Sequence, residues 1–183
     1  MILKFIILLL NLTSISQEKY IGSVERLSPE INNLIDKNSK IEIIAEGFEW
    51  SEGPIWSTEL NSVLFSDVPE NVIYTWNEDK GLNVFTKPIG YSGEVPNLKK
   101  AGTNGLTIDS DGNLIICMHG DRKIAIMEDL NINKMSTLVG NFKDNLFNSP
   151  NDLVYDSEGN LFFTDPPYGL LEGDDDKLKE IPF

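Results

Sequence analysis

The sequence predicts an all-β fold built from repeated four-stranded units. From Ile41 onward, short apolar or alternating runs are separated by Gly, Pro, Asn and Asp, and no helical pattern of domain-building length interrupts them. In addition, segment 104–114 recurs as segment 151–161, with seven of eleven positions identical at an offset of 47 residues. Repeats of roughly 40 to 50 residues with about four strands each are typical of β-propeller blades. The alternative is one large antiparallel sandwich with chance similarity between its turns.

The first sixteen residues have the pattern of a secretory signal peptide. Lys4 precedes the apolar run 5–10, and Ser14-Ile15-Ser16 offers a small-x-small cleavage site. The run is shorter than the ~20 residues that a membrane-spanning helix needs. We therefore expect 1–16 to be removed and the mature protein, starting at Gln17, to be periplasmic or secreted and not held in a membrane. An uncleaved amphipathic N-terminus is the alternative.

Residues 17–40 are polar and predict a short helix or linker in front of the repeats. Ser28-Pro29-Glu30 is a helix-start pattern, and Ile31, Leu34 and Ile35 follow at helical spacing. This segment suggests no function.

Residues 41–183 are expected to form part of a β-propeller. The expected strands are 41–45, 63–67, 72–76, 84–87, 105–108, 114–118, 123–127, 135–139, 153–155 and 161–164. Both copies of the repeat place Asp-Ser-(Asp/Glu)-Gly-Asn between two apolar runs, the composition of a tight hairpin turn. A third, weaker copy runs from Glu52 to Asp67. Blades are therefore expected to start near Glu52, Asn104 and Asn151.

The charge of the chain argues against polyanionic partners. With 29 acidic and 15 basic residues, the net charge is −14, which disfavours nucleic acid and anionic membrane surfaces. Neutral small molecules and cations remain plausible ligands.

Cys117 is the only cysteine, so the chain cannot form an internal disulfide. Because it lies in the apolar run 114–118, it is expected to be a small buried hydrophobic residue rather than a nucleophile.

Glu52, Asn104 and Asn151 hold the same place in three successive repeats, where an inner strand begins. Innermost strands of a propeller run along its central channel, so these polar side chains are expected to converge near one mouth of the axis. A carboxylate with amide oxygens suits Ca²⁺ or Mg²⁺, whereas zinc is improbable in a chain with one His and one Cys. Asn is also a common turn residue, so strand capping remains the alternative at each position.

Several strings of the sequence resemble motifs of the SMP-30/gluconolactonase/LRE family. They are Glu49-Trp-Ser-Glu-Gly-Pro-Ile-Trp56, Ala101-Gly-Thr-Asn-Gly-Leu-Thr-Ile-Asp109, Cys117-Met-His-Gly-Asp-Arg122 and Asn148-Ser-Pro-Asn-Asp-Leu-Val154. Phe163-Thr-Asp-Pro-Pro-Tyr-Gly-Leu170 is similar to the bacterial gluconolactonase branch. The resemblance covers about residues 45 to 183. It implies a six-bladed propeller, about the first three blades of which are present here, with a catalytic divalent cation, usually Ca²⁺, on its axis.

The resemblance also implies roles for single residues. Glu52 matches an acidic metal ligand, Asn151 matches an asparagine that binds the metal or faces the substrate, and Asn104 matches a position that lines the site mouth. His119 lies where the related paraoxonase group has a histidine near its catalytic centre, which makes it a candidate catalytic or site-facing residue. Since Asn104 stands where that group has the partner histidine, a histidine pair is doubtful. Two further family ligands, one of them the favoured general base, have no counterpart in this sequence.

The function implied by the resemblance is calcium-dependent hydrolysis of sugar lactones or related esters. The ion would polarise the lactone carbonyl while a carboxylate activates water. Because the residues present match the N-terminal half of such an enzyme, this chain is expected to be incomplete on its own. The alternatives are a non-catalytic propeller that binds a small ligand or a protein partner, and self-association of half propellers into a full ring.

Overall fold

The computed structural model describes residues 19–93, 102–132 and 134–182, and the chain divides into two compact units between Glu46 and Gly47. The expected signal peptide at 1–16 lies outside the described residues. Within the described part, no helix combines the length and the apolar character needed to cross a bilayer.

The first unit contains a short 3₁₀-helix, η1 (Pro29–Asn33), at the position where a short helix was expected. Ser28 caps it by accepting the backbone N–H of Glu30, and proline stands in its first turn. The expected strand 41–45 is absent, because this segment makes only one antiparallel bridge, between Tyr20 and Glu42. The unit that holds the blades begins at Gly47 instead.

Blade 1 is a four-stranded antiparallel sheet whose strands follow chain order. They are β1 (Ser51–Ser57), β2 (Ser62–Asp67), β3 (Val72–Asn77) and β4 (Gly81–Thr86). The expected strands 63–67, 72–76 and 84–87 correspond to β2, β3 and the second half of β4. β1 had no apolar run of its own, because Gly53 and Pro54 interrupt it where the register shifts.

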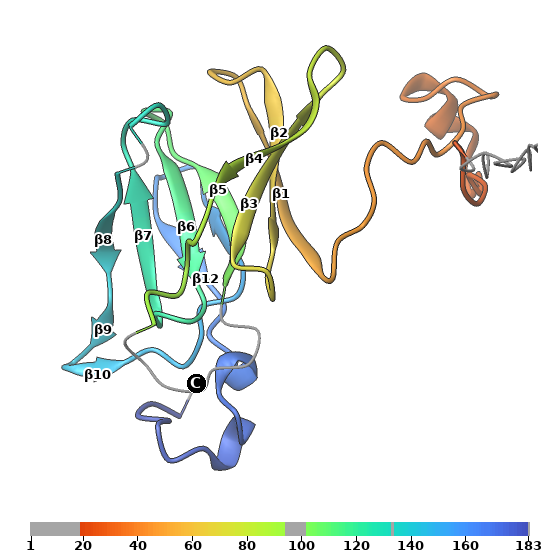
Figure 1. Cartoon of the computed structure of the whole chain (residues 1–183). Helices are drawn as coiled ribbons and strands as arrows, with labels where there is room; N and C mark the ends of the chain where they lie inside the picture. Colours follow the sequence, from red (N-terminus) through yellow and green to blue (C-terminus); the bar gives the residue numbers. More distant parts are fainter. Residues whose placement is uncertain (1–18, 94–101, 133, 183) are drawn as a thin grey trace, which may run out of the picture. The chain divides into compact units, whose positions relative to one another are not determined.

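Blade 2 repeats this arrangement and is followed by a small hairpin (Figure 1). Its strands are β5 (Thr103–Ile108), β6 (Leu114–Met118), β7 (Lys123–Met127) and β8 (Ser136–Val139), and the hairpin consists of β9 (Asn141–Phe142) and β10 (Asn145–Leu146). Lys143 and Asp144 both have positive φ, at 52° and 67°, as a two-residue type I′ hairpin loop requires.

Blade 3 is represented by its first hairpin. This comprises β11 (Leu153–Tyr155) and β12 (Leu161–Phe163), and two 3₁₀-helices follow, η2 (Pro167–Gly169) and η3 (Gly173–Asp175).

The core lies between the blades, and β6 shows how. All five of its residues are buried. Leu114, Ile116 and Met118 belong to the cluster between blades 1 and 2, whereas Ile115 and Cys117 belong to the cluster between blades 2 and 3. A strand covered on both faces needs apolar residues at every position, which explains the unbroken run. Burial raises the pKa of the Cys117 thiol far above its usual range, and the expectation of a small buried residue at this position is confirmed.

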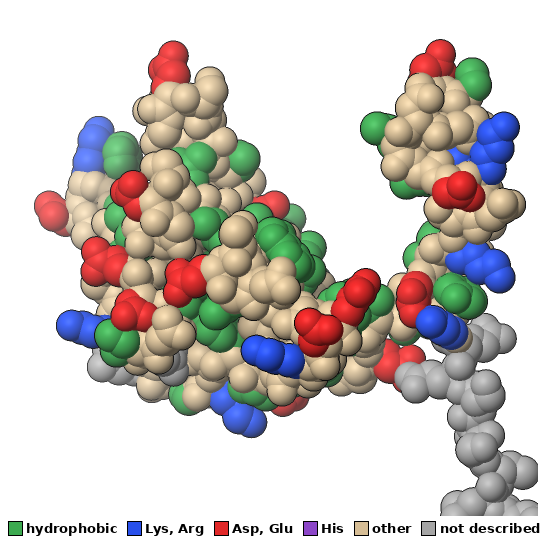
Figure 2. Space-filling view, turned by 90° about the horizontal axis from the view of Figure 1, so that it is seen from above, with side chains coloured by type: hydrophobic (Ala, Val, Ile, Leu, Met, Phe, Trp, Pro, Cys, Tyr) green, Lys and Arg blue, Asp and Glu red, His purple; other side chains and the backbone are tan. Residues whose placement is uncertain are grey.

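The other face of blade 1 is apolar as well. The register places Trp56, Val63, Trp76 and Leu82 in one cross-strand row. Trp56 is 50% exposed and Leu82 is 39% exposed. Figure 2 shows hydrophobic side chains on the surface of the larger unit, between scattered acidic ones. A sheet with two apolar faces is typical of one layer in a stack.

Contacts between sheets run through the first strand of each blade, because β1 lies against β5 and β5 lies against β11. Successive sheets thus share an inner edge, as blades do around an axis, rather than forming the two layers of a sandwich. The propeller prediction is confirmed. The described residues form two complete blades and the first hairpin of a third.

Candidate functional site

Neighbouring inner strands come into close backbone contact at two glycines. A Cβ on Gly53 would lie 2.7 Å from the backbone oxygen of Asn104, and a Cβ on Gly105 would lie 2.8 Å from that of Asn151. The Gly105 N–H also donates to the Asn151 oxygen at 2.7 Å. Since Glu52 directly precedes Gly53, the backbones of the three predicted positions lie close to one another where β1, β5 and the segment before β11 meet.

Glu52 is half-buried, and its carboxylate is oriented by a neighbour. Its Oε1 accepts a hydrogen bond from the indole N–H of Trp50 at 2.7 Å. The residue lies opposite Ser66 on β2, just before the register shift of β1. The irregularity of this strand therefore begins directly after the candidate ligand.

Asn104 is only 6% exposed and is held through its backbone. Its carbonyl oxygen accepts the Ser66 hydroxyl at 2.7 Å, and that hydroxyl in turn accepts the Thr103 hydroxyl at 2.9 Å. These bonds join blade 1 to the inner strand of blade 2.

Asn151 is half-buried, and both of its backbone polar groups are engaged. Its N–H donates to the Thr164 carbonyl at 2.9 Å, and its own carbonyl accepts the Gly105 N–H. The backbone of this candidate ligand is therefore tied to β5 in blade 2 and to the residue that follows β12 in blade 3.

In blade 1, the Asp67 carboxylate holds the segment that leads into β1. Asp67 is 1% exposed, and its two oxygens accept the backbone N–H groups of Glu49 and Trp50 at 3.0 and 3.1 Å. Each oxygen takes one N–H, so the side chain grips two consecutive residues.

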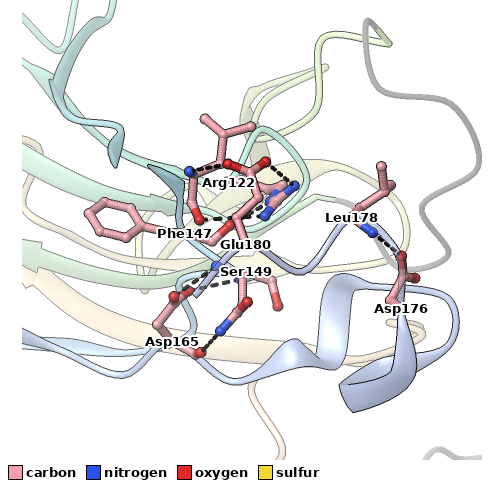
Figure 3. A network of polar contacts seen from close by, with 9 residues as sticks. Arg122, Phe147, Ser149, Asp165, Asp176, Leu178 and Glu180 are labelled. Carbon is pink, nitrogen blue, oxygen red and sulfur yellow. Dashed lines mark hydrogen bonds and ion pairs between the residues drawn. The ribbon is translucent and has the colours of Figure 1, made fainter. Parts of the chain in front are cut away.

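Asp165 makes the same pair of bonds in blade 3 (Figure 3). Its oxygens accept the N–H groups of Asn148 and Ser149 at 2.7 and 2.8 Å. Burial raises the pKa of Asp165, while these two hydrogen bonds and the charge of Arg122 oppose the rise.

His119 is 3% exposed and contacts the residue before Asn151. Its Nδ1 lies 3.3 Å from the Pro150 carbonyl oxygen, and a carbonyl can only accept, so Nδ1 carries the proton in this contact. Gly169 packs so closely that a Cβ there would lie 2.8 Å from Nε2. Burial lowers the pKa of His119, which favours the neutral ring. A catalytic role stays a prediction, and the geometry supports bracing of Pro150.

Figure 3 also shows a buried arginine that sequence analysis missed. Arg122 adopts a positive φ of 57° and donates through Nε to the Phe147 carbonyl, while its Nη1 lies 3.6 Å from Glu180 Oε1. Glu180 Oε2 accepts the Leu146 N–H at 2.8 Å. Burial lowers the pKa of Arg122, and Glu180 opposes this shift. The network fixes the chain that enters blade 3.

The donor atoms at the inner-strand ends are of the type that a hard cation prefers. Glu52 offers a carboxylate, and Asn104 and Asn151 offer amide oxygens. The described residues contain no group of three or more His, Cys, Asp or Glu side chains that could hold a metal. Since Ca²⁺ takes about six to eight oxygen ligands, these residues supply only part of a coordination shell.

These features define a section of a β-propeller with oxygen-rich side chains where its inner strands begin. The chain belongs to the SMP-30/Gluconolactonase/LRE-like family, whose profile matches residues 50–179. It is 37% identical over 165 residues to a gluconolactonase from Zymomonas mobilis subsp. mobilis, an alignment that covers 89% of this chain and 46% of that protein. The family resemblance of the motifs is thereby confirmed.

Two solved structures are similar in fold. A gluconolactonase from Xanthomonas campestris is 30% identical, with a TM-score of 0.63 over 74% of this chain and 41% of that one. A candidate gluconolactonase is 29% identical, with a TM-score of 0.68 over 79% of this chain and 46% of that one. The chain thus spans less than half the length of the relatives it matches.

Proposed function

We propose that the gene product containing these residues hydrolyses sugar lactones and uses Ca²⁺ as its metal. The observation that carries the proposal is the adjacency of Glu52, Asn104 and Asn151, which rests on the close approach of β1, β5 and β11. Membership of the family and the identity to a gluconolactonase support the choice of substrate class.

Each residue has a distinct task in this proposal. Glu52 and Asn151 would hold the cation, and Asn104 would bind substrate at the site mouth. When bound, the cation would supply a Lewis acid for a lactone carbonyl. Glu52 also contributes a negative charge, and the hydrogen bond from Trp50 orients its carboxylate. His119, with the proton on Nδ1, contacts the Pro150 carbonyl oxygen and supports the segment before Asn151.

The 183-residue chain alone should bind Ca²⁺ weakly. One carboxylate and one amide oxygen are many fewer ligands than the about six to eight oxygens of a full calcium shell. Both the affinity for the ion and the rigidity of the site grow with the number of protein ligands. Further ligands and a general base would have to come from outside these residues.

The test is hydrolysis of glucono-δ-lactone by the full gene product, in the presence of either CaCl₂ or EDTA. The reaction is monitored by titrating the released protons at constant pH. We expect activity with calcium, loss with chelator, and loss in Glu52→Gln. Glu78→Gln, in the exposed turn between β3 and β4, is the matched control and should stay active. Hydrolysis that survives both EDTA and Glu52→Gln would refute the calcium site. Calcium binding without hydrolysis of any lactone would favour a binding propeller instead.

Export to the periplasm or the medium is a second part of the proposal, supported by the pattern of residues 1–16. N-terminal sequencing of the protein from its own host should find Gln17 first. An intact Met1 on the accumulated protein would overturn it.

A further inference from the structure

In blades 1 and 3, the carboxylate of an aspartate, buried in Asp67 and half-buried in Asp165, holds the backbone just ahead of a candidate metal ligand. Asp67 binds the N–H groups of the third and second residues before Glu52, and Asp165 does the same before Asn151. Each carboxylate uses one oxygen for each N–H, which restricts both the position and the rotation of the segment. The held residues are Glu-Trp in one blade and Asn-Ser in the other, so the device acts on the backbone and not on particular side chains.

Blade 2 lacks this device in the part that the structure describes. Met118 stands at the strand position that Asp67 has in blade 1, as the two registers show. Asn104 is held instead through its own carbonyl oxygen, by the Ser66 hydroxyl. Among the described residues, the carboxylate therefore occurs in the two blades that offer a candidate metal ligand, and the blade with the candidate substrate-binding residue has Met118 at that strand position.

Around Asp165, each residue of the segment 148–150 has a further contact. The Asn148 side-chain amide donates to the backbone oxygen of Asp165 at 3.1 Å, and the Ser149 hydroxyl accepts the Gly169 N–H at 2.8 Å. Pro150 is in contact with His119 through its carbonyl oxygen. This density of contacts leaves the approach to Asn151 little freedom.

We propose that Asp67 and Asp165 are positioning residues that hold Glu52 and Asn151 in the arrangement needed to bind the divalent cation. The inference rests on the proposed function. A metal ligand has to be held within about 0.5 Å of its productive position by the residues behind it. Both oxygens of each carboxylate accept a backbone N–H group of the segment that leads to the candidate ligand, so we assign these side chains a role that acts through the ligands.

The experiment is calorimetric titration of the full gene product with CaCl₂, on the wild type and on Asp165→Asn and Asp67→Asn. Asparagine keeps the size but turns an NH₂ group toward one of the two N–H donors, which breaks half of the grip. We expect calcium to bind at least about tenfold more weakly, as when a residue behind a metal ligand is lost. The rise in melting temperature on adding calcium should shrink accordingly.

Asp156→Asn is the matched control. Asp156 also accepts two backbone N–H groups, those of Glu158 and Asn160, but at the opposite end of the β11–β12 hairpin. The same chemical change there should leave calcium affinity unaltered, even if it lowers the melting temperature in EDTA.

A double variant separates positioning from general destabilisation. If Asp165 acts through Asn151, then adding Asp165→Asn to Asn151→Ala should cost no further calcium affinity, whereas independent effects would multiply. The same cycle applies to Asp67→Asn with Glu52→Gln. Multiplying losses, or unchanged affinity in folded single variants, would overturn the inference. So would a failure of both aspartate variants to fold, since that would make the carboxylates structural.

These outcomes are distinct from failure of the proposed function. A wild-type protein that binds no calcium removes the proposed metal site, and this inference falls with it. A wild-type protein that binds calcium no better than the two folded aspartate variants removes this inference alone.

Discussion

At one end of blades 2 and 3, Asp109 and Asp156 close the first hairpin with the same set of bonds. Each carboxylate accepts the N–H groups two and four residues later, together with the side-chain amide of the asparagine four residues later. At the other end lie Glu52 in blade 1, Asn104 in blade 2 and Asn151 in blade 3. Asp109 and Asp156 bond within their own turns, whereas Asn104 and Asn151 bond through their backbone oxygens to the neighbouring blade.

This difference indicates at which end the choice of residue is constrained by the stability of the fold alone. A hairpin turn has to satisfy the same backbone groups in each blade, so one solution serves repeatedly. The inner-strand ends meet each other, and their side chains can differ because the contact between blades is made by backbone and glycine. We therefore expect substitutions at the turn end to affect stability only, and those at the inner-strand end to affect function as well.

The largest effect should follow Glu52→Gln at the inner-strand end. If the proposed function holds, removing the charge of this candidate ligand should lower lactone hydrolysis more than about 100-fold, which exceeds the loss expected when a residue that only positions a ligand is changed. The melting temperature should fall relative to wild type only when calcium is present. Differential scanning calorimetry with calcium and with EDTA checks this, and an equal drop in both conditions would place Glu52 among the structural residues.

Gly105→Ala should have the next largest effect at the inner-strand end. Its Cβ would meet Asp152 Oδ1 at 2.7 Å and the Asn151 carbonyl oxygen at 2.8 Å, and the backbone of β11 cannot move aside without separating the blades. We expect about 3 kcal/mol of destabilisation, at the upper end for overpacking. Urea unfolding followed by circular dichroism gives the value. A loss below about 1 kcal/mol would mean that the inner strands are looser than the contacts indicate.

Gly112→Ala, at the turn end, should cost less. Gly112 has a φ of 92° but nothing within 4 Å of the added Cβ, so only the backbone conformation opposes the change. About 1 to 2 kcal/mol is expected for a left-handed alanine. Calcium affinity should stay at the wild-type value. A change in affinity would contradict the expectation that substitutions at the turn end affect stability only.

The smallest effect concerns pH, and it originates at the inner-strand end. Because burial lowers the pKa of His119, protonation favours the unfolded chain. This contribution to stability is therefore complete above the ordinary pKa of about 6.5 and is lost as the pH falls below it, with a slope of at most about 1.4 kcal/mol per pH unit. Urea unfolding between pH 8 and pH 5.5 should show a shallower slope for His119→Gln than for wild type. Equal slopes would show that His119 titrates in the folded protein as it does in the unfolded chain.

The repeat in the sequence was sufficient to predict the blades, whereas the roles of Glu52, Asn104 and Asn151 stay predictions. It succeeded because turn residues and apolar runs are local signals. Strand 41–45 failed because alternation predicts a conformation but supplies no partner strand, and the segment finds only one bridge. β9 and β10 were missed because two-residue strands are too short to show a period.

The residues that hold the segments next to the candidate ligands were harder to predict from the sequence. Asp67 and Asp165 both close a Phe-(Ser/Thr)-Asp string, a signal that was present in the sequence as the end of a strand. Their task depends on N–H groups 16 to 18 residues earlier, which no local pattern reveals. The role of Arg122 gave no local signal, because two of its partners are carbonyl oxygens that any residue can supply and the third, Glu180, lies 58 residues later.

The bond from Trp50 to Glu52 gives the protein an optical reporter. All three tryptophans of the chain, Trp50, Trp56 and Trp76, lie in blade 1 or directly before it, so the tryptophan fluorescence of these residues reports on this blade alone. The Trp50 indole N–H donates to the carboxylate oxygen that a cation would compete for. Occupancy of Glu52 should therefore change the emission of Trp50, and blades 2 and 3 contribute no tryptophan background that would mask it.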